Sequence, residues 1–216
     1  MLRDRDTHIK FSLVVASLIA LGVIAYFSLG FLQPRETSVN SYQILLNRGT
    51  DAIDIGQYDE ALNYYNQALV IAREVGDRAG EGVSLACIGF VYEAKGQHDQ
   101  ALEYFNQALV IAREVGDREG EEASLTCIGV VYAAAKGQYD QALEHFNQAL
   151  VITREIGDRA GEGNNLANIG KTYKAKGQYD QALEYYNQAL VIARELKLFS
   201  LEKAVLDAIN NLPKSP

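Results

Sequence analysis

Two cysteines and three histidines are the side chains of this sequence whose types suit metal binding or nucleophilic catalysis. Cys87 and Cys127 are 40 residues apart and form neither a CxxC motif nor a metal-ligand spacing. His98 and His145 stand where other copies of a repeated segment carry tyrosine, and neither has a Ser, Cys or carboxylate that would complete a catalytic group. The sequence therefore predicts no enzyme, no cofactor and no metal site.

The charge balance argues against nucleic acid as a partner. The 216 residues include 20 Lys and Arg against 28 Asp and Glu, a formal net charge of -8, and the basic residues form no cluster that would contact phosphates. Hydrophobic residues make up 48% of the chain, which is enough to build a folded core. We therefore expect a folded, acidic domain that does not bind nucleic acid or anionic lipid.

The elements that carry these residues belong to a repeat. Nearly the same segment starts at Tyr58, His98, Tyr139 and Tyr179, at intervals of 40, 41 and 40 residues. A period of this length, with apolar residues recurring at threes and fours in both halves of each copy, predicts stacked pairs of antiparallel helices. The sequence thus predicts an all-α fold in which each copy is too small to be stable alone.

Glycine and aspartate mark the expected helix ends. Glycines are expected to end the helices, at Gly76, Gly96, Gly116, Gly137, Gly157 and Gly177. Asp77, Asp117 and Asp158 are expected to cap the helices that follow. The charged residues of the REVGDRxGE segments at these joints predict a solvated face with exposed ion pairs, each worth at most about 1 kcal/mol.

Small and large side chains recur where two helices must touch. Gly49, Gly89, Gly129 and Gly170 fall in the middle of the first helix of each copy. Glycine costs a helix about 1 kcal/mol there, so a packing reason is expected. The aromatic residues Tyr65, Phe105, Phe146 and Tyr186 recur in the second helix and are expected to fill the space between copies.

At these residues the chain resembles the tetratricopeptide repeat family. The pattern LxxIGxxYxxxGQYDQALxxxxQAL appears with small variations from Leu85, Leu125 and Leu166, and a more divergent copy starts near Leu45. The long period and the REVGDR joint are similar to the extended repeats of kinesin light chains. The resemblance implies an α-solenoid, a right-handed superhelix of antiparallel helix pairs that binds a peptide or protein in its concave groove.

The resemblance also suggests where the array begins and ends. We predict four repeat units over residues 41–198, a capping helix over 199–212 and a tail at 213–216. Arg48 stands where the other copies have Ile88, Ile128 and Ile169, as suits a first unit with one solvated side. One extra residue near Ala133 to Ala135 is expected to bulge or lengthen a helix end.

The first residues predict a membrane anchor. After a flank at 1–10, residues 11–32 contain no charge and would form a helix about 33 Å long, which matches a hydrocarbon core of about 30 Å. The rival interpretation is a cleaved signal peptide, but the apolar run exceeds the usual length of about 7 to 15 residues. A linker at 33–40 would hold the repeats near the membrane. The basic residues favour an inside N-terminus in a bacterial-type plasma or internal membrane.

The resemblance implies that the first helix of each copy lines the groove, so its inward residues are candidates for partner binding. These are Gln43, Leu46, Asn47 and Thr50, then Val83, Ala86, Cys87 and Phe90, then Ala123, Thr126, Cys127 and Val130, and finally Asn164, Ala167, Asn168 and Lys171. The middle of the groove is apolar and both ends are polar. We expect an apolar segment in the middle, with Asn47, Asn168 and Lys171 binding its backbone or a carboxylate. Alternatively, the apolar residues are only buried between neighbouring helices.

The sequence thus predicts a membrane-anchored adaptor or scaffold for protein–protein interaction, for example in assembling a membrane complex. Two alternatives remain open. The protein could be a self-associating structural subunit, a homo-oligomer held through the groove or the span, or it could be a regulatory subunit of a membrane enzyme. The sequence does not identify the partner.

Overall fold

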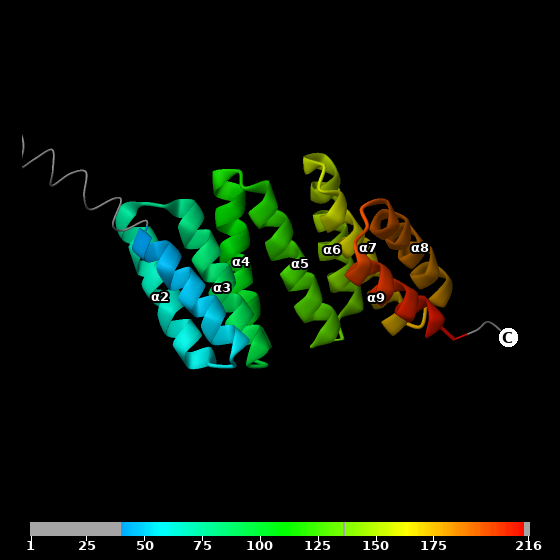
Figure 1. Cartoon of the computed structure of the whole chain (residues 1–216), viewed down its shortest axis with the longest axis horizontal. Coiled ribbons are helices and arrows are strands. Elements are labelled where there is room, and N and C mark those ends of the chain that lie inside the picture. Colours follow the sequence, from blue (N-terminus) through cyan, green and yellow to red (C-terminus); the bar gives the residue numbers. More distant parts are fainter. Residues whose placement is uncertain (1–39, 136, 214–216) are drawn as a thin grey trace, which may run out of the picture. The chain divides into compact units, whose positions relative to one another are not determined.

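The computed structural model describes residues 40–135 and 137–213, which are helical apart from short turns (Figure 1). The chain divides into two compact units, Met1–Ile44 and Leu45–Pro216, and the description below concerns the second. The predicted membrane span at 11–32 and its flank lie outside the described residues. Within the described part of the chain, no helix is long and apolar enough to cross a membrane.

Helices follow one another in sequence order, each antiparallel to the next (Figure 1). After the helical residues 45–54 come α2 (Tyr58–Val75), α3 (Arg78–Ala94), α4 (His98–Val115), α5 (Arg118–Ala134), α6 (Tyr139–Ile156), α7 (Arg159–Ala175), α8 (Tyr179–Glu195) and α9 (Phe199–Asn210). Four helix pairs result: residues 45–54 with α2, α3 with α4, α5 with α6, and α7 with α8. The all-α solenoid predicted from the repeats is confirmed for these residues.

Glycine and aspartate end and start the helices as expected. Gly76 adopts the left-handed φ of 70° after α2, and the Asp77 carboxylate accepts a hydrogen bond from the Gly80 N–H at 2.9 Å. The same two caps recur at Gly116 with Asp117 and at Gly157 with Asp158. The turn before α9 lacks both, because Lys197 takes the left-handed position and Leu198 the cap position.

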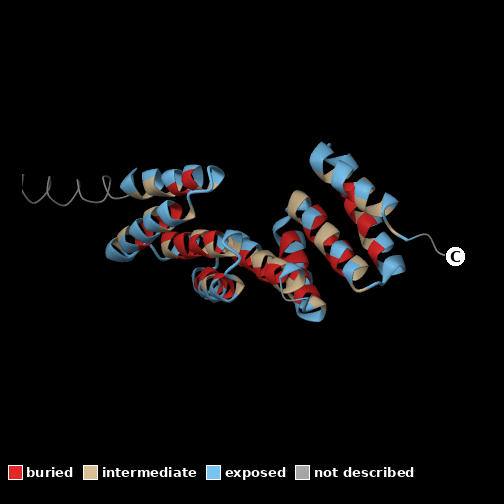
Figure 2. Cartoon of the chain, turned by 90° about the horizontal axis from the view of Figure 1, so that it is seen from below, coloured by how far each residue is buried: buried red, intermediate tan, exposed pale blue. Residues whose placement is uncertain are grey.

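Each helix pair is closed by an aromatic ring that lies on a glycine. A Cβ atom on Gly89 would come within 2.8 Å of the Phe105 ring, so no larger residue fits there without moving the ring. The same contact joins Gly49 with Tyr65, Gly129 with Phe146 and Gly170 with Tyr186. Phe105 also shares a core cluster with Leu125 and Ile128 of the next pair. The rings therefore fill space within their own pair as well as between pairs, and Figure 2 shows the resulting buried stripes.

The extra residue of the third pair is absorbed by a turn. The helix α5 has 17 residues, as do α3 and α7, so the insertion does not lengthen it. The Gln138 N–H instead donates to the Tyr132 carbonyl at 2.9 Å, across one more residue than the bond from Gln97 to Tyr92 at 2.8 Å. The repeat thus continues in register after the insertion.

The helix α9 packs on α8 and also contacts α7. It stands where the first helix of another pair would be, and its Val205 is buried. Leu206, Ile209 and Leu212 remain only partly buried, whereas their counterparts in α3 are buried by α4. Asn210 occupies the position of the central glycine.

Candidate functional site

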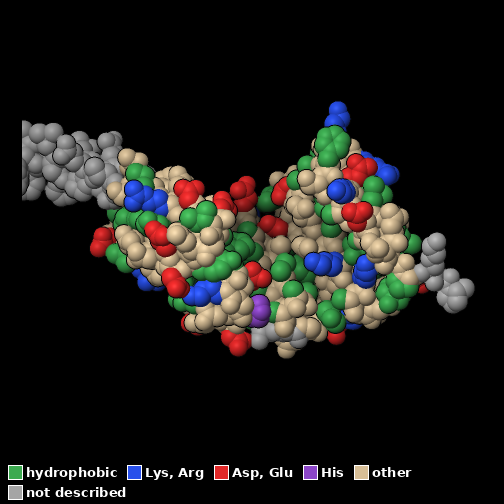
Figure 3. Space-filling model, turned by 60° about the horizontal axis from the view of Figure 1, so that its bottom comes forward, with side chains coloured by type: hydrophobic (Ala, Val, Ile, Leu, Met, Phe, Trp, Pro, Cys, Tyr) green, Lys and Arg blue, Asp and Glu red, His purple; other side chains and the backbone are tan. Residues whose placement is uncertain are grey.

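The first helices of the pairs bring the predicted site residues onto one face. The helix α3 contacts α5, α5 contacts α7, and α7 contacts α9. Equivalent positions therefore form neighbouring rows, which we call the groove face: Val83, Ala86, Cys87 and Phe90 on α3, Ala123, Thr126, Cys127 and Val130 on α5, and Asn164, Ala167, Asn168 and Lys171 on α7. Asn47 is exposed at the equivalent position in the first pair. Figure 3 shows a hollow, with apolar side chains on one wall and basic side chains on the other.

An apolar cavity of about 210 Å³ opens between α3, α4 and α5. From the groove face, it is lined by Val83, Ala86, Cys87, Phe90, Ala123 and Cys127. Phe90 rests edge-on against Phe105, with ring centroids 5.2 Å apart, yet 48% of Phe90 is exposed. The middle of the groove thus presents accessible apolar surface, which a partner could cover.

The two cysteines in this cavity are free thiols. Burial raises the pKa of Cys87 to about 11. Burial raises the pKa of Cys127 to about 12, and the charges of Glu122 and Glu93 contribute to this shift. Both side chains are therefore neutral thiols at physiological pH. A nucleophile or a metal ligand would instead have to be a thiolate. Their place in the cavity suits apolar contact.

A polar network that the sequence did not reveal joins α5 to α7. The Thr126 hydroxyl lies 2.8 Å from Asn165 Oδ1 and 2.9 Å from Glu122 Oε1, and Asn165 Nδ2 donates to the same Glu122 oxygen at 2.7 Å. Asn165 is only 1% exposed. Thr126 is thus already engaged within the chain. The available sequence signal was that Glu122 and Asn165 replace a glycine and a serine of the α3 copy.

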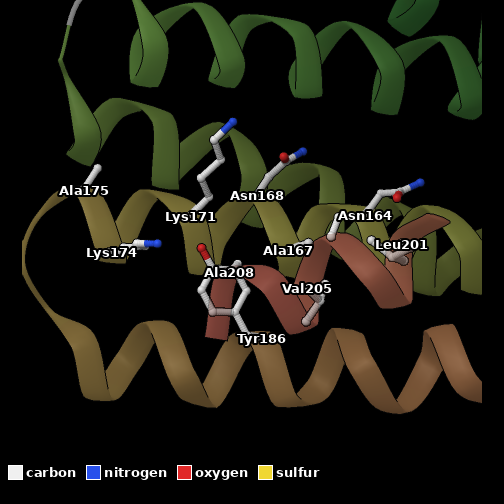
Figure 4. A pocket seen from close by; sticks show the side chains of 11 residues that line it. Asn164, Ala167, Asn168, Lys171, Lys174, Ala175, Tyr186, Leu201, Val205 and Ala208 are labelled. Carbon is white, nitrogen blue, oxygen red and sulfur yellow. The ribbon is translucent and has the colours of Figure 1, made fainter. Parts of the chain in front are cut away.

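The C-terminal part of the groove face is polar. Val130, Asn168 and Lys171 border a cavity of about 210 Å³ between α5, α6 and α7. Asn164, Ala167, Asn168 and Lys171 line a cavity of about 780 Å³ between α7, α8 and α9 (Figure 4). The structure therefore brings Asn168 and Lys171 together, whereas Asn47 belongs to the first helix pair.

The charged joints form a ladder that is more buried than expected. The Glu121 side chain is 10% exposed and contacts Arg113 at 2.8 Å and Arg118 at 2.5 Å, and Arg118 also contacts Glu155. Burial alone would raise the pKa of Glu121, but the hydrogen bonds from the two arginines outweigh it and lower the pKa. The same arrangement surrounds Glu81 and Glu162. The predicted ion pairs are present and their arginines remain about half exposed, but Glu81, Glu121 and Glu162 are more buried than predicted, because each of them lies between neighbouring pairs.

Of the described histidines, His145 occupies a packing position. His145 stacks on Tyr132 with ring centroids 5.5 Å apart, just as Tyr104 stacks on Tyr92 in the preceding pair. Burial lowers the pKa of His145, which keeps the ring neutral. Within the described ranges, no three His, Cys, Asp or Glu side chains are grouped so that they could hold a metal ion.

These features define a helical repeat array with a grooved surface. A family model described as Tetratricopeptide repeat matches residues 41–114, 82–136 and 120–195, and the chain belongs to this family. Tetratricopeptide arrays typically act as scaffolds that bind protein or peptide partners, so the chain has the general role of an interaction adaptor. No curated protein matches the sequence.

Solved structures share the fold at low identity. Aspartyl phosphate phosphatase F from Bacillus subtilis has 21% identity and a TM-score of 0.72, over 85% of this chain and 48% of that one. A Rap protein complexed with Competence and Sporulation Factor has 20% identity and a TM-score of 0.67, over 78% and 47%. A putative kinesin light chain from Podosopora anserina has 21% identity and a TM-score of 0.57, over 72% and 74%. The chain thus spans about half the length of the first two proteins.

Proposed function

We propose that the protein is a membrane-anchored adaptor whose groove face binds an apolar segment of another polypeptide. The observation that carries this proposal is a contrast between exposed positions of the same repeat. The segment Asn-Gln-Ala-Leu-Val-Ile is identical in all four second helices, starting at Asn66, Asn106, Asn147 and Asn187. The groove face, in contrast, changes from pair to pair.

The unchanged segment includes residues that are at least half exposed. We call its valines, Val70, Val110, Val151 and Val191, the outer row, and they are 52%, 53%, 53% and 64% exposed. On the groove face, Phe90 becomes Val130 and then Lys171 at equivalent positions. Exposure alone therefore does not explain the changes. A polypeptide lying along the groove would contact each helix pair with a different part of its own sequence. This would account for the different residues on the groove face of each pair.

The order of side chains suggests the partner's character. The apolar residues of α3 and α5 suit a run of aliphatic or aromatic side chains. At α7, Asn168 and Lys171 can donate hydrogen bonds to backbone carbonyls or a carboxylate. The Rap protein structure with Competence and Sporulation Factor supports the idea that a similar array holds a partner.

The membrane anchor is part of the proposal and depends on residues 11–32. An uncharged run of this length suits a single span, and the linker at 33–40 would keep the array close to the membrane surface. With the N-terminus inside, the array would work on the outer side. An adaptor in this place would help to assemble a membrane complex.

Paired charge insertions test the groove assignment. In the full chain, expressed in its native membrane with an affinity tag, Phe90→Asp with Val130→Asp should abolish recovery of the partner, since a buried charge would face apolar side chains. The matched control is Val110→Asp with Val151→Asp, which places the same charges on the outer row. Helical circular dichroism should be unchanged in both variants. Equal recovery with the groove variant and the wild type would rule out the groove as the binding site.

A further inference from the structure

The cavity between α7, α8 and α9 differs from the apolar cavity of the groove. Its volume of about 780 Å³ falls within the range of roughly 300 to 1,000 Å³ that is usual for small-molecule sites. Leu201, Val205 and Ala208 of α9 form one wall, and polar side chains of α7 form the other (Figure 4). One side of the cavity is thus suited to an apolar group and the other to a polar one.

The hydroxyl group of Tyr186 points into this cavity (Figure 4). Tyr186 is only 2% exposed, and its hydroxyl has no hydrogen-bond partner among the residues that the structure describes. In the first pair, the equivalent Tyr65 hydroxyl lies 3.3 Å from the Thr50 hydroxyl, but the position of Thr50 is taken by Lys171 in the fourth pair. Burial raises the pKa of Tyr186, so this group keeps its proton and can donate it in a hydrogen bond.

Two lysines on α7 add positive charge without a neutralising partner. Lys171 and Lys174 line the cavity, and neither has a carboxylate at salt-bridge distance within the described part of the chain. The nearby Lys176, which is not part of the cavity lining, is paired with Asp140. In a chain with a net charge of -8, unpaired cations beside an unpartnered hydroxyl indicate a site for an anion.

We propose that this cavity binds a small carboxylic acid with a compact apolar body. The carboxylate accepts hydrogen bonds from the Tyr186 hydroxyl and from the ammonium groups of Lys171 and Lys174, while the apolar body packs on the α9 wall. The bound acid bridges α7 and α9 and so stabilises the last helix. This site uses the C-terminal end of the proposed groove but does not require the polypeptide partner.

Calorimetric titration tests the proposal directly. The full chain, held in a neutral detergent, is titrated with isovalerate and phenylacetate, and with isovaleramide, phenylacetamide and inorganic phosphate for comparison. The acids should bind at one site per chain and raise the melting temperature, and the neutral amides should bind at least about tenfold more weakly because they lack the charge. Phosphate should also bind more weakly, since it leaves the α9 wall uncovered.

Matched variants assign the binding to this cavity. Tyr186→Phe should weaken acid binding about tenfold, and it should fold because Phe105 and Phe146 occupy the equivalent positions. Lys171→Gln with Lys174→Gln should weaken it further. Tyr65→Phe and Lys176→Gln remove the same groups outside the cavity and should leave the affinity within about twofold of the wild type.

Three results would overturn the proposal: no binding of either acid at about 10 mM, equal binding of phosphate, or acid binding unchanged by Tyr186→Phe and by the lysine variant. The polypeptide adaptor is tested separately by Phe90→Asp alone, because Phe90 lies on α3 away from this cavity and its substitution should not affect the acid. If free acids fail to bind while partner recovery depends on Lys171 and Lys174, the small-acid site is wrong and the adaptor proposal stands.

Discussion

Val110 of the outer row and Phe90 of the groove face are similarly accessible, yet the two surfaces differ in how much the repeat has changed. Val110 and Phe90 are 53% and 48% exposed, so neither is fixed by burial. The outer row repeats the same residue four times, whereas the groove face offers apolar residues on α3 and α5 and polar ones on α7. This difference supports the proposal that the groove face makes pair-specific contacts with a partner.

The cysteines of the groove face should react unusually slowly. At pH 8 the raised pKa values leave very little thiolate, so alkylation of Cys87 by iodoacetamide should be about 100-fold slower than in the unfolded chain. Cys127 should be slower still. The rate should rise with pH up to about 11, and because folding favours the neutral thiols, their contribution to stability should fade as pH rises above about 9. Rapid labelling at pH 8, followed by mass spectrometry, would contradict this account.

The glycines beneath the groove face should tolerate no side chain. Gly129→Ala adds a Cβ atom 2.7 Å from the Phe146 ring, so we expect the free energy of unfolding to fall by about 2 to 3 kcal/mol. At an uncrowded helix position the same change would stabilise by about 1 kcal/mol. Urea denaturation followed by circular dichroism measures the difference. A more stable variant would show that the ring and glycine are not in close contact.

The ion-pair ladder distinguishes interior joints from the end of the array. Glu121→Gln removes a buried charge held by two arginines and should destabilise by about 2 kcal/mol. Glu202→Gln is the matched change at the last joint, where one arginine contacts a side chain that is 26% exposed, and it should cost less than about 0.5 kcal/mol. Thermal melts of the two variants compare them. Equal losses would mean that burial of the carboxylate is unimportant.

At His145, the second helix of the third pair differs from its copies, which carry tyrosine. The effect of His145 on the free energy of unfolding should be small and dependent on pH. Because folding lowers the pKa of His145, its contribution to stability is present above about pH 6.5 and is lost as pH falls through the folded-state pKa. His145→Tyr restores the stacked tyrosine pair. Between pH 7 and pH 5 the variant should therefore lose less stability than the wild type. Parallel loss in both proteins would contradict the assigned shift.

Local features of the fold were predictable from the sequence. Gly76 and Asp77 cap helices through contacts within one turn, so they could be predicted locally. The glycine and the aromatic residue of each pair recur at the repeat period, so their contact could also be predicted. The Glu122 and Asn165 contact was not predictable, because it joins residues 43 apart that both depart from the repeat. The buried ladder was missed for a related reason: Arg78 and Glu114 are 36 residues apart and meet only after α3 and α4 have packed together.

The sequence predicted which candidate residues share one face, but it did not predict the cavities beside them. Equivalence between copies placed Phe90 and Lys171 on one face, since the first helices stack in register. The C-terminal cavity needs a wall from α9, in which only Leu206 and Ile209 align clearly with the repeat. Tyr186 was interpreted as a packing residue, because nothing in the sequence shows that its hydroxyl has no partner.

Site-specific photo-crosslinking tests the central claim most directly. A photoreactive phenylalanine analogue is placed at Phe90 on the groove face or at Val110 on the outer row of the full chain in its native membrane. After illumination, the account predicts a discrete crosslinked adduct from position 90 and none from position 110. Adducts from position 110 alone, or equal adducts from both positions, would contradict it.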